Sequence, residues 1–148
     1  MLVRDVMTPN VPAIALEATL TAAAEKMLAD HTDTLFVVEG ERLVGTIGLR
    51  DLFTAPVPAH FEGATLRQPD LNALRQVWNR TRVEHLMNTN VLSVTEDTPL
   101  LKAAEIMINS GKHPLPVLRQ GAVVGMITRQ AVVRAVLAAR HGEMNGNR

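Results

Sequence analysis

Five histidines and two serines are the side chains that could most readily bind a metal ion or act as a nucleophile. No two histidines stand three or four positions apart, so no helix face would present two imidazoles to a zinc ion. Neither Ser93 nor Ser110 lies in the Gly-x-Ser-x-Gly turn that exposes the nucleophile of many hydrolases. The sequence therefore predicts no catalytic residue and no metal site.

Ser110-Gly111-Lys112 is the segment that comes closest to a phosphate-binding loop. A P-loop has an earlier glycine and a Ser or Thr directly after the lysine, and this segment has neither. The acids Glu96, Asp97 and Glu105 stand near an expected helix start, where the helix dipole favours a carboxylate. None of these residues requires a catalytic function to explain it.

The composition is that of an ordinary globular chain, with 47% hydrophobic and only 3% aromatic residues in 148. Fifteen basic and fifteen acidic residues balance, so the net charge offers no attraction to nucleic acid or to an anionic membrane. There is no cysteine, Asp5 argues against a signal peptide, and no apolar run approaches the roughly 20 residues of a membrane helix. We expect a soluble, cytoplasmic protein that binds neither nucleic acid nor membrane.

The elements that must position any binding residue occur twice, because the chain contains an internal repeat. Aligned without a gap, residues 3–53 and 83–133 share more identities than unrelated segments of this composition would. The identical pairs are Val3/Val83, Met7/Met87, Asn10/Asn90, Val11/Val91, Leu20/Leu100, Ala23/Ala103, Ala24/Ala104, Glu25/Glu105, Met27/Met107, Leu35/Leu115, Val37/Val117, Val44/Val124, Gly45/Gly125 and Ile47/Ile127.

Each copy has the pattern of a short strand, a helix, two strands and a closing helix. Apolar residues recur at i, i+3, i+4, i+7 and i+8 from Leu20 and again from Leu100, which predicts one buried helix face in each copy. Thr98 with Pro99 is predicted to cap the second helix, and Gly111 to end it. The predicted strands are 13–14, 35–39 and 43–47 in the first copy, and 93–94, 115–119 and 122–128 in the second, with hairpin turns at Gly40 and Gln120-Gly121.

Two further helices are predicted outside this common pattern. The closing helix of the second copy runs from about Arg129 to Arg140, with an apolar face of Val132, Val133, Val136 and Leu137. Between the copies, a loop marked by Pro56, Pro58 and Gly63 precedes a short amphipathic helix with Leu71, Leu74, Val77 and Trp78. Trp78, the single tryptophan, is predicted to anchor the packing of that helix.

The leading segment Val3-Arg4-Asp5-Val6-Met7-Thr8-Pro9 and the order of elements after it resemble the CBS domain, named after cystathionine beta-synthase. Segment 111–117 is similar to the family's segment that leads into its second strand. Segments 43–51 and 124–128 are both similar to its third strand and the exit from that strand. The resemblance implies an α/β fold of mixed α+β type, in which two β-α-β-β-α units pack sheet to sheet about a pseudo-twofold axis. It divides the chain into a first CBS unit 1–54, a linker with a short helix 55–82, a second CBS unit 83–141 and a flexible tail 142–148.

In that family a Ser or Thr, two residues and an Asp follow the third strand, and the Asp holds ribose hydroxyls of a bound adenosine nucleotide. The first copy has Gly48 in place of the hydroxyl residue but keeps Asp51. The second copy keeps Thr128 but has Ala131 in place of the Asp. Neither copy therefore has the complete signature.

The resemblance implies one stronger nucleotide site, because the family places the strand exit of one unit opposite the start of the other. Carried over to this chain, the predicted site consists of Asp51, Arg50, Val91, Ser93, Lys112, His113 and Pro114. Asp51 would accept hydrogen bonds from ribose, and Lys112 and His113 would bind phosphate. Structural explanations stay open beside this one, since an acid is favoured in any first helical turn and Lys112 could simply be solvated.

A weaker second site is implied around Thr34, Thr128 and Arg129. It lacks the ribose-binding acid, and it places Asp33 where phosphate would go, so like charges would oppose binding. Thr128 is also a natural helix N-cap, which is sufficient to explain it.

The resulting prediction is a non-catalytic regulatory module that senses AMP, ADP or ATP and requires no cofactor. The alternative is a dimerisation or protein-interaction module with vestigial clefts and no ligand. Surplus apolar residues such as Leu101 and Ile106 favour a homodimer formed through helices. A regulated protein partner is also implied, without any residue that identifies it.

Overall fold

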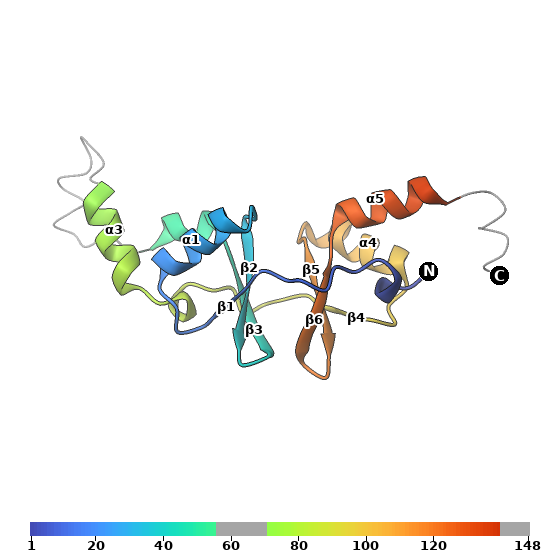
Figure 1. Cartoon of the computed structure of the whole chain (residues 1–148), viewed down its shortest axis with the longest axis horizontal. Coiled ribbons are helices and arrows are strands. Elements are labelled where there is room, and N and C mark those ends of the chain that lie inside the picture. Colours follow the sequence, from blue (N-terminus) through green and yellow to red (C-terminus); the bar gives the residue numbers. More distant parts are fainter. Residues whose placement is uncertain (56–70, 140–148) are drawn as a thin grey trace. The chain divides into compact units, whose positions relative to one another are not determined.

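A computed structural model describes residues 1–55 and 71–139, and its contacts divide the chain into two compact units (Figure 1). Unit 2 is the continuous segment Pro12–Val91. Unit 1 combines Met1–Val11 with Leu92–Arg148. Each unit contains a three-stranded mixed sheet and its own helices, so the predicted mixed α/β class is confirmed.

Unit 2 contains the strands and helices of the first repeat and the helix that follows it. Its elements are β1 (Ala13–Ala15), α1 (Leu20–Ala29), β2 (Thr34–Glu39), β3 (Arg42–Gly48), the 3-10 helix η2 (Leu49–Thr54), α3 (Leu71–Arg80) and the 3-10 helix η3 (Val83–His85). β1 pairs in parallel with β2, and β2 pairs antiparallel with β3 through a turn in which Gly40 has a φ of +65°. The predicted strands of this copy are therefore confirmed to within one residue at most ends.

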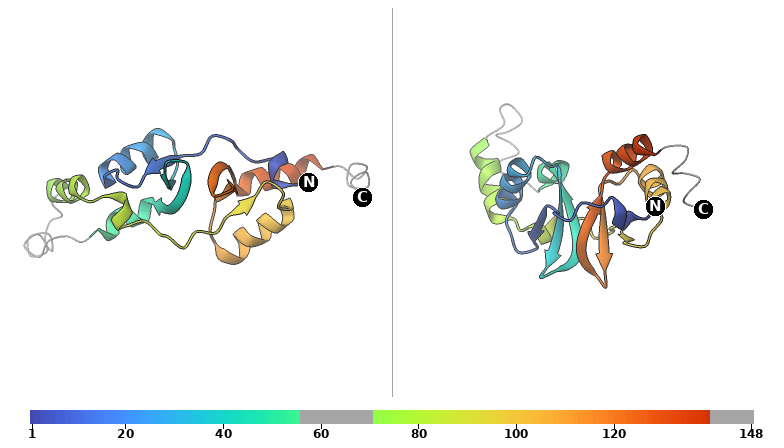
Figure 2. Two further views of the ribbon diagram at one scale, coloured as in Figure 1. Left: turned by 90° about the horizontal axis from the view of Figure 1, so that it is seen from below. Right: turned by 45° about the vertical axis from the view of Figure 1, so that its right-hand side comes forward.

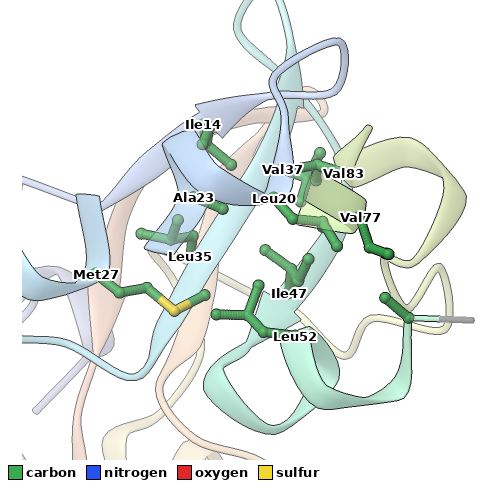
Figure 3. Packing of buried hydrophobic residues seen from close by; sticks show 11 residues of the cluster. Ile14, Leu20, Ala23, Met27, Leu35, Val37, Ile47, Leu52, Val77 and Val83 are labelled. Atoms are coloured by element: carbon green, nitrogen blue, oxygen red, sulfur yellow. The ribbon is translucent and has the colours of Figure 1, made fainter. Parts of the chain in front are cut away.

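The core of unit 2 lies between α1 and the sheet (Figures 1 and 2). Figure 3 shows its side chains pointing toward one another from β1, α1, β2, β3, η2 and α3. Leu20, Ala23 and Met27 form the buried face of α1, as their helical spacing predicts. The Thr19 hydroxyl accepts a hydrogen bond from the Ala22 N–H at 3.1 Å and caps the helix.

Trp78 anchors α3 on this core, as predicted. It packs against the buried cluster, and its Nε1–H donates a hydrogen bond to the Leu52 carbonyl at 2.9 Å. The neighbouring Val77 is buried, whereas Leu71 is 76% exposed although the amphipathic pattern included it. The helix therefore packs through Ala73 and Val77, one turn apart, while its first residue is exposed.

Unit 1 repeats this arrangement with the second copy. Its elements are the 3-10 helix η1 (Val3–Asp5), β4 (Val94–Thr95), α4 (Leu100–Ser110), β5 (Leu115–Arg119), β6 (Ala122–Ile127) and α5 (Arg129–Ala138). β4 pairs in parallel with β5, and β5 pairs antiparallel with β6. Gly111 ends α4 in the left-handed conformation with φ +70°, which confirms its predicted role.

The predicted cap of α4 by Thr98 is wrong. The helix begins at Leu100 after Pro99, and no side chain caps its first turn. The Thr98 hydroxyl instead accepts a hydrogen bond from the Thr95 N–H at 3.0 Å, which closes the turn after β4. A threonine just before a proline can satisfy either a turn or a helix end, and the sequence pattern does not separate the two.

The predicted apolar face of α5 is only partly buried. Val132 packs against the core of unit 1, but Val133, Val136 and Leu137 are 55%, 59% and 79% exposed. Ala131 supplies the buried contact of the first turn instead. An apolar stripe read from sequence does not say which of its residues the core will cover.

The segment that leads into each repeat packs against the other repeat. Thr8 and Met126 exchange backbone hydrogen bonds at 2.9 Å in unit 1, where Figure 2 shows the N-terminal segment running beside β6. Thr46 and Asn88 form the same bridge in unit 2. The compact units therefore do not coincide with the two copies of the repeat.

Gly45 and Gly125 permit this bridge because a side chain there would meet backbone. A Cβ on Gly45 would lie 2.9 Å from the Asn88 carbonyl oxygen, and one on Gly125 would lie 2.9 Å from that of Thr8. Met87 and Met7 fill the space beside these glycines. The same contact of a glycine with a methionine and the backbone beside it occurs in both units. It explains the identical pairs Gly45/Gly125 and Met7/Met87 of the repeat.

Two predictions fall on residues outside this description, namely the loop with Pro56, Pro58 and Gly63 and the flexible tail 142–148. Among the described residues, no helix has the length and apolar character required to cross a bilayer.

Candidate functional site

The exit of β3 in unit 2 holds the carboxylate of Asp51 in a fixed position. Gly48 ends the strand in an extended conformation, and its N–H donates a hydrogen bond of 2.7 Å to Asp51 Oδ2. Asp51 is half-buried at the third position of η2, while Arg50 beside it is exposed. The carboxylate is thus ordered by the backbone before any ligand is present.

This hydrogen bond leaves most of the acceptor capacity of Asp51 unused. An ionised carboxylate offers about four lone-pair positions on its two oxygens. The Gly48 N–H occupies one of them, and no other hydrogen bond or ion pair to this carboxylate exists among the described residues. Asp51 can therefore accept from two neighbouring hydroxyl groups, such as the 2′ and 3′ hydroxyls of a ribose.

The segment before β2 lies next to this carboxylate. The Asp33 carbonyl accepts a hydrogen bond from the Leu49 N–H at 2.8 Å, which joins the start of η2 to the start of β2. The Thr34 hydroxyl donates to Asp33 Oδ1 at 3.4 Å. Thr34, predicted for the weaker second site, is therefore engaged with an acid of its own unit.

Val91 belongs to the same unit as Asp51 and is half-buried at its end. The bridge between Thr46 and Asn88 holds the preceding segment against β3, and the Asn90 N–H donates to Asn88 Oδ1 at 2.9 Å. Of the seven predicted residues of the stronger site, unit 2 thus contains Arg50, Asp51 and Val91.

Unit 1 contains the other four, Ser93, Lys112, His113 and Pro114. The Ser110 hydroxyl donates to the Ile106 carbonyl at 2.6 Å and accepts from the Lys112 N–H at 3.1 Å, so it fixes the turn between α4 and β5. Lys112 is half-buried and His113 is exposed, and the peptide bond from His113 to Pro114 is cis. Lys112 and His113 both lie in the short segment between α4 and β5.

The exit of β6 in unit 1 has the complementary arrangement to the exit of β3. The Thr128 hydroxyl accepts a hydrogen bond from the Ala131 N–H at 3.0 Å, which confirms Thr128 as an N-cap. The position equivalent to Asp51 is occupied by Ala131, which is buried and has no carboxylate. Arg129, the third residue of the weaker site, is exposed.

A charged pair that the sequence did not indicate lies near β4. Arg119 donates two parallel hydrogen bonds to Glu96, at 2.8 and 2.9 Å, and these lower the pKa of the Glu96 carboxyl below its ordinary value. The same hydrogen bonds raise the pKa of the Arg119 guanidinium. Because 23 positions separate the two residues, no local spacing rule could have paired them.

No group of three or more His, Asp or Glu side chains in residues 1–55 and 71–139 is arranged to hold a metal ion.

Comparison with known families and proteins agrees with the internal repeat. The family model described as "CBS domain" matches the chain twice, over residues 3–57 and 83–138. The two matches cover both copies of the repeat and leave out the segment between them.

The chain is also similar to individual proteins over most of its length. It is 29% identical to an uncharacterized 17.7 kDa protein of Acidianus ambivalens, covering 91% of this chain and 73% of that protein. It is 28% identical to a CBS domain-containing protein of Dictyostelium discoideum, covering 87% of this chain and 86% of that one. The solved structure of CBSX2, a CBS-pair protein of Arabidopsis thaliana, in complex with AMP is 26% identical with a TM-score of 0.72 and covers 92% of this chain and 96% of CBSX2.

Proposed function

The chain belongs to the CBS domain family as a tandem pair, and from this premise we propose that it is a regulatory module that senses an adenosine nucleotide. The observation that carries the proposal is the likeness to CBSX2, which was solved with AMP and is matched over nearly its whole length. Stand-alone CBS pairs are typically non-catalytic, and we propose that this chain likewise has no activity of its own.

Asp51 is the residue that we propose for ribose recognition. Its carboxylate is oriented by the Gly48 N–H and keeps acceptor positions for two hydroxyl groups. A carboxylate that is already ordered loses little conformational entropy on binding, which favours affinity. Arg50 and Val91 of the same unit are the proposed neighbours of the nucleoside.

Lys112 and His113 are the residues that we propose for phosphate binding, with Ser93 and Pro114 beside them. A cation paired with phosphate forms a stronger, charge-assisted hydrogen bond than a neutral donor does. The Ser110 hydroxyl holds the backbone of Lys112 and thereby limits where its side chain can reach. AMP, ADP and ATP share the ribose and α-phosphate that these residues would bind.

We propose that the second site, with Thr34, Thr128 and Arg129, has the weaker affinity. Thr34 donates to Asp33, whose charge would oppose a phosphate, and Thr128 already caps α5. The buried Ala131 supplies no acceptor for ribose.

A second candidate function is dimerisation without a ligand, and exposed residues of α4 favour it. Leu101 and Ile108, seven positions apart on one helix face, are 72% and 79% exposed. Ile106, which the sequence suggested for this role, packs against the core of unit 1 instead. We propose that α4 forms a homodimer contact through Leu101 and Ile108, whether or not nucleotide is bound.

Calorimetric titration of AMP and ATP into the wild type and Asp51→Asn tests the nucleotide proposal. The amide oxygen of Asn can still accept from the Gly48 N–H, but the side chain has lost one acceptor oxygen and its charge. We expect the affinity for both nucleotides to fall about tenfold or more, since hydrogen bonds to a charged group contribute about 1.5–3 kcal/mol.

Asp5→Asn is the matched control. Asp5 Oδ2 accepts from the Leu2 N–H at 2.7 Å, the same backbone contact that Asp51 makes, but Asp5 is not one of the proposed binding residues. Nucleotide affinity should be unchanged in this variant. Equal affinities of the wild type and Asp51→Asn, or no heat with either nucleotide, would contradict the proposal and favour the ligand-free dimer.

A further inference from the structure

The short helix η2, which carries Asp51, is held by two hydrogen bonds that each involve a side chain. The Gly48 N–H, just before the helix, donates to Asp51 Oδ2 at 2.7 Å. The next residue, Leu52, is buried, and Figure 3 shows its side chain pointing into the core of unit 2. The Leu52 carbonyl accepts a hydrogen bond from Trp78 Nε1–H at 2.9 Å. The indole of α3 therefore contacts the backbone of η2 one residue after the proposed ribose acceptor.

The indole supplies a donor that the chain cannot supply by continuing as an α-helix. In an α-helix the Leu52 carbonyl would accept from the N–H four positions later. Residue 56 is a proline, and proline has no N–H in any conformation. Ala55, which precedes it, has already left the helical conformation with a ψ of 132°, and η2 is a 3-10 helix of six residues. Hydrogen bonds in a 3-10 helix have poorer geometry than those in an α-helix, so η2 depends more on contacts from outside.

Unit 1 shows what the equivalent positions form when the proline is absent. By the repeat, residue 56 corresponds to Val136, and α5 continues through it as an α-helix to Ala138. The position of Asp51 is occupied there by Ala131. The acid, the proline and the indole donor thus occur together in the same copy of the repeat.

α3 can fix the position of η2 because α3 is itself attached to the rest of unit 2. Val77 is buried in the core. The Thr21 hydroxyl of α1 donates to Asn79 Oδ1 at 2.5 Å. The Thr81 carbonyl, directly after α3, accepts from the Leu20 N–H at 2.9 Å. The place where α3 packs therefore sets the position of the indole donor and, through it, of the η2 backbone.

We propose that Trp78 is a positioning residue of the Asp51 site, and that ligand binding at Asp51 in turn strengthens the docking of α3. The proposal rests on the proposed nucleotide site, although the hydrogen bond from Trp78 is present without a ligand. Coupling between two binding events is reciprocal. A donor that favours the binding position of the carboxylate must therefore be held more firmly once a ligand occupies that carboxylate. α3 is then the element through which occupancy of the site changes the surface of unit 2.

The indole of Trp78 can be observed directly, because it is the single tryptophan of the chain and gives one N–H signal in a nitrogen-15 NMR spectrum. Addition of AMP to the full-length protein should shift this signal and slow the exchange of its proton with water at least about threefold. Without ligand, Asp51→Ala should speed the exchange, because it removes the other contact that holds η2. Asp5→Ala, which removes the same kind of contact in unit 1, should not.

Calorimetric titration of AMP into Trp78→Phe measures the effect on the site. Phenylalanine keeps an aromatic ring but has no donor for the Leu52 carbonyl, so the affinity for AMP should fall about threefold to tenfold. Val77→Ala is the control, because it weakens the packing of α3 and keeps the indole N–H. It should lower the thermal midpoint at least as much as Trp78→Phe does and leave the affinity for AMP unchanged.

Three results with a protein that binds AMP would overturn the proposal. They are an unchanged affinity in Trp78→Phe, an equal loss of affinity in Val77→Ala, and an indole signal that does not respond to bound AMP. If the wild type binds no AMP, the proposed nucleotide function fails, and the ligand-free spectrum decides the positioning role by itself. Faster indole exchange in Asp51→Ala would then support that role, and unchanged exchange would overturn it.

Discussion

The carboxylate of Asp51 and the N–H of Gly48 form one half of a helix capping box. The other half, a threonine hydroxyl that accepts from a backbone N–H three residues later, occurs at Thr128 and Ala131. These are equivalent positions of the repeat, so each copy retains the part of the box that the other lacks. The incomplete ligand signatures of the two copies are therefore also incomplete helix caps.

Gly48→Ser should complete the box and raise the free energy of unfolding. A Cβ at this position would lie 3.5 Å from the Asp33 carbonyl oxygen and 3.6 Å from Asp51 Oδ2, which are ordinary contacts. The gain should be about 0.5–1 kcal/mol, from a less flexible unfolded chain and from the new cap. Gly48→Ala is the control, because it also makes the unfolded chain less flexible but adds no hydroxyl group. The difference between the two variants in denaturant unfolding gives the contribution of the hydroxyl group to stability. A serine variant no more stable than the alanine variant would show that the hydroxyl does not cap η2.

Gly45→Ala should destabilise the protein although it adds only one methyl group. The new Cβ would lie 2.9 Å from both the Asn88 carbonyl oxygen and Met87 Sδ, so the backbone bridge between Thr46 and Asn88 must shift. Overpacking of this kind costs about 1–3 kcal/mol, and urea unfolding measures it. Gly48→Ala again serves as the control, and a loss no larger than in that variant would mean that the leading segment moves aside freely.

The secondary structure of both repeats could be predicted from the sequence, whereas the contacts between distant segments could not. β5 begins at Leu115 and ends at Arg119 as predicted, because an apolar run between a Pro-containing segment and a Gln-Gly turn fixes both ends locally. The pairing of Arg119 with Glu96 depends on the parallel register of β4 with β5, which no spacing in the sequence specifies.

The candidate site was predictable to the extent that it depends on a local motif. Asp51 follows a strand at a spacing that places it in the first turn of a helix, so its capping contact follows from the sequence. The exposure of Val133 and Leu137 could not be foreseen from the sequence. The same apolar periodicity occurs in a helix whose apolar face is buried on a core and in one whose apolar face is exposed.

Loss of the Arg119 side chain should make the protein more sensitive to acid. The hydrogen bonds from Arg119 lower the pKa of Glu96, so this pair stabilises the fold above the ordinary glutamate pKa, and the contribution is lost as the pH falls through the lowered value. Arg119→Met removes the largest cause of the lowered pKa, so the wild type and the variant should differ in stability near neutral pH and converge in acid. Circular dichroism during thermal unfolding at several pH values measures this, with Arg42→Met as an exposed control. A difference between wild type and Arg119→Met that persists in strong acid would show that packing, and not the ion pair, is responsible.

The proposed homodimer predicts that a single charge on α4 will separate the subunits. In a symmetric interface each substitution acts twice, so Ile108→Glu would place two carboxylates where two aliphatic side chains had been buried. Burial of one such side chain contributes about 1.5–3 kcal/mol, so the dissociation constant should rise by at least about a hundredfold. Light scattering should then give a mass near 16.1 kDa for the variant and twice that for the wild type. Val136→Glu is the matched control, because it places the same charge on an exposed aliphatic position of α5 and should leave the dimer intact. A wild-type mass near 16.1 kDa at all concentrations would refute the dimer, and dissociation by Val136→Glu alone would move the contact from α4 to α5.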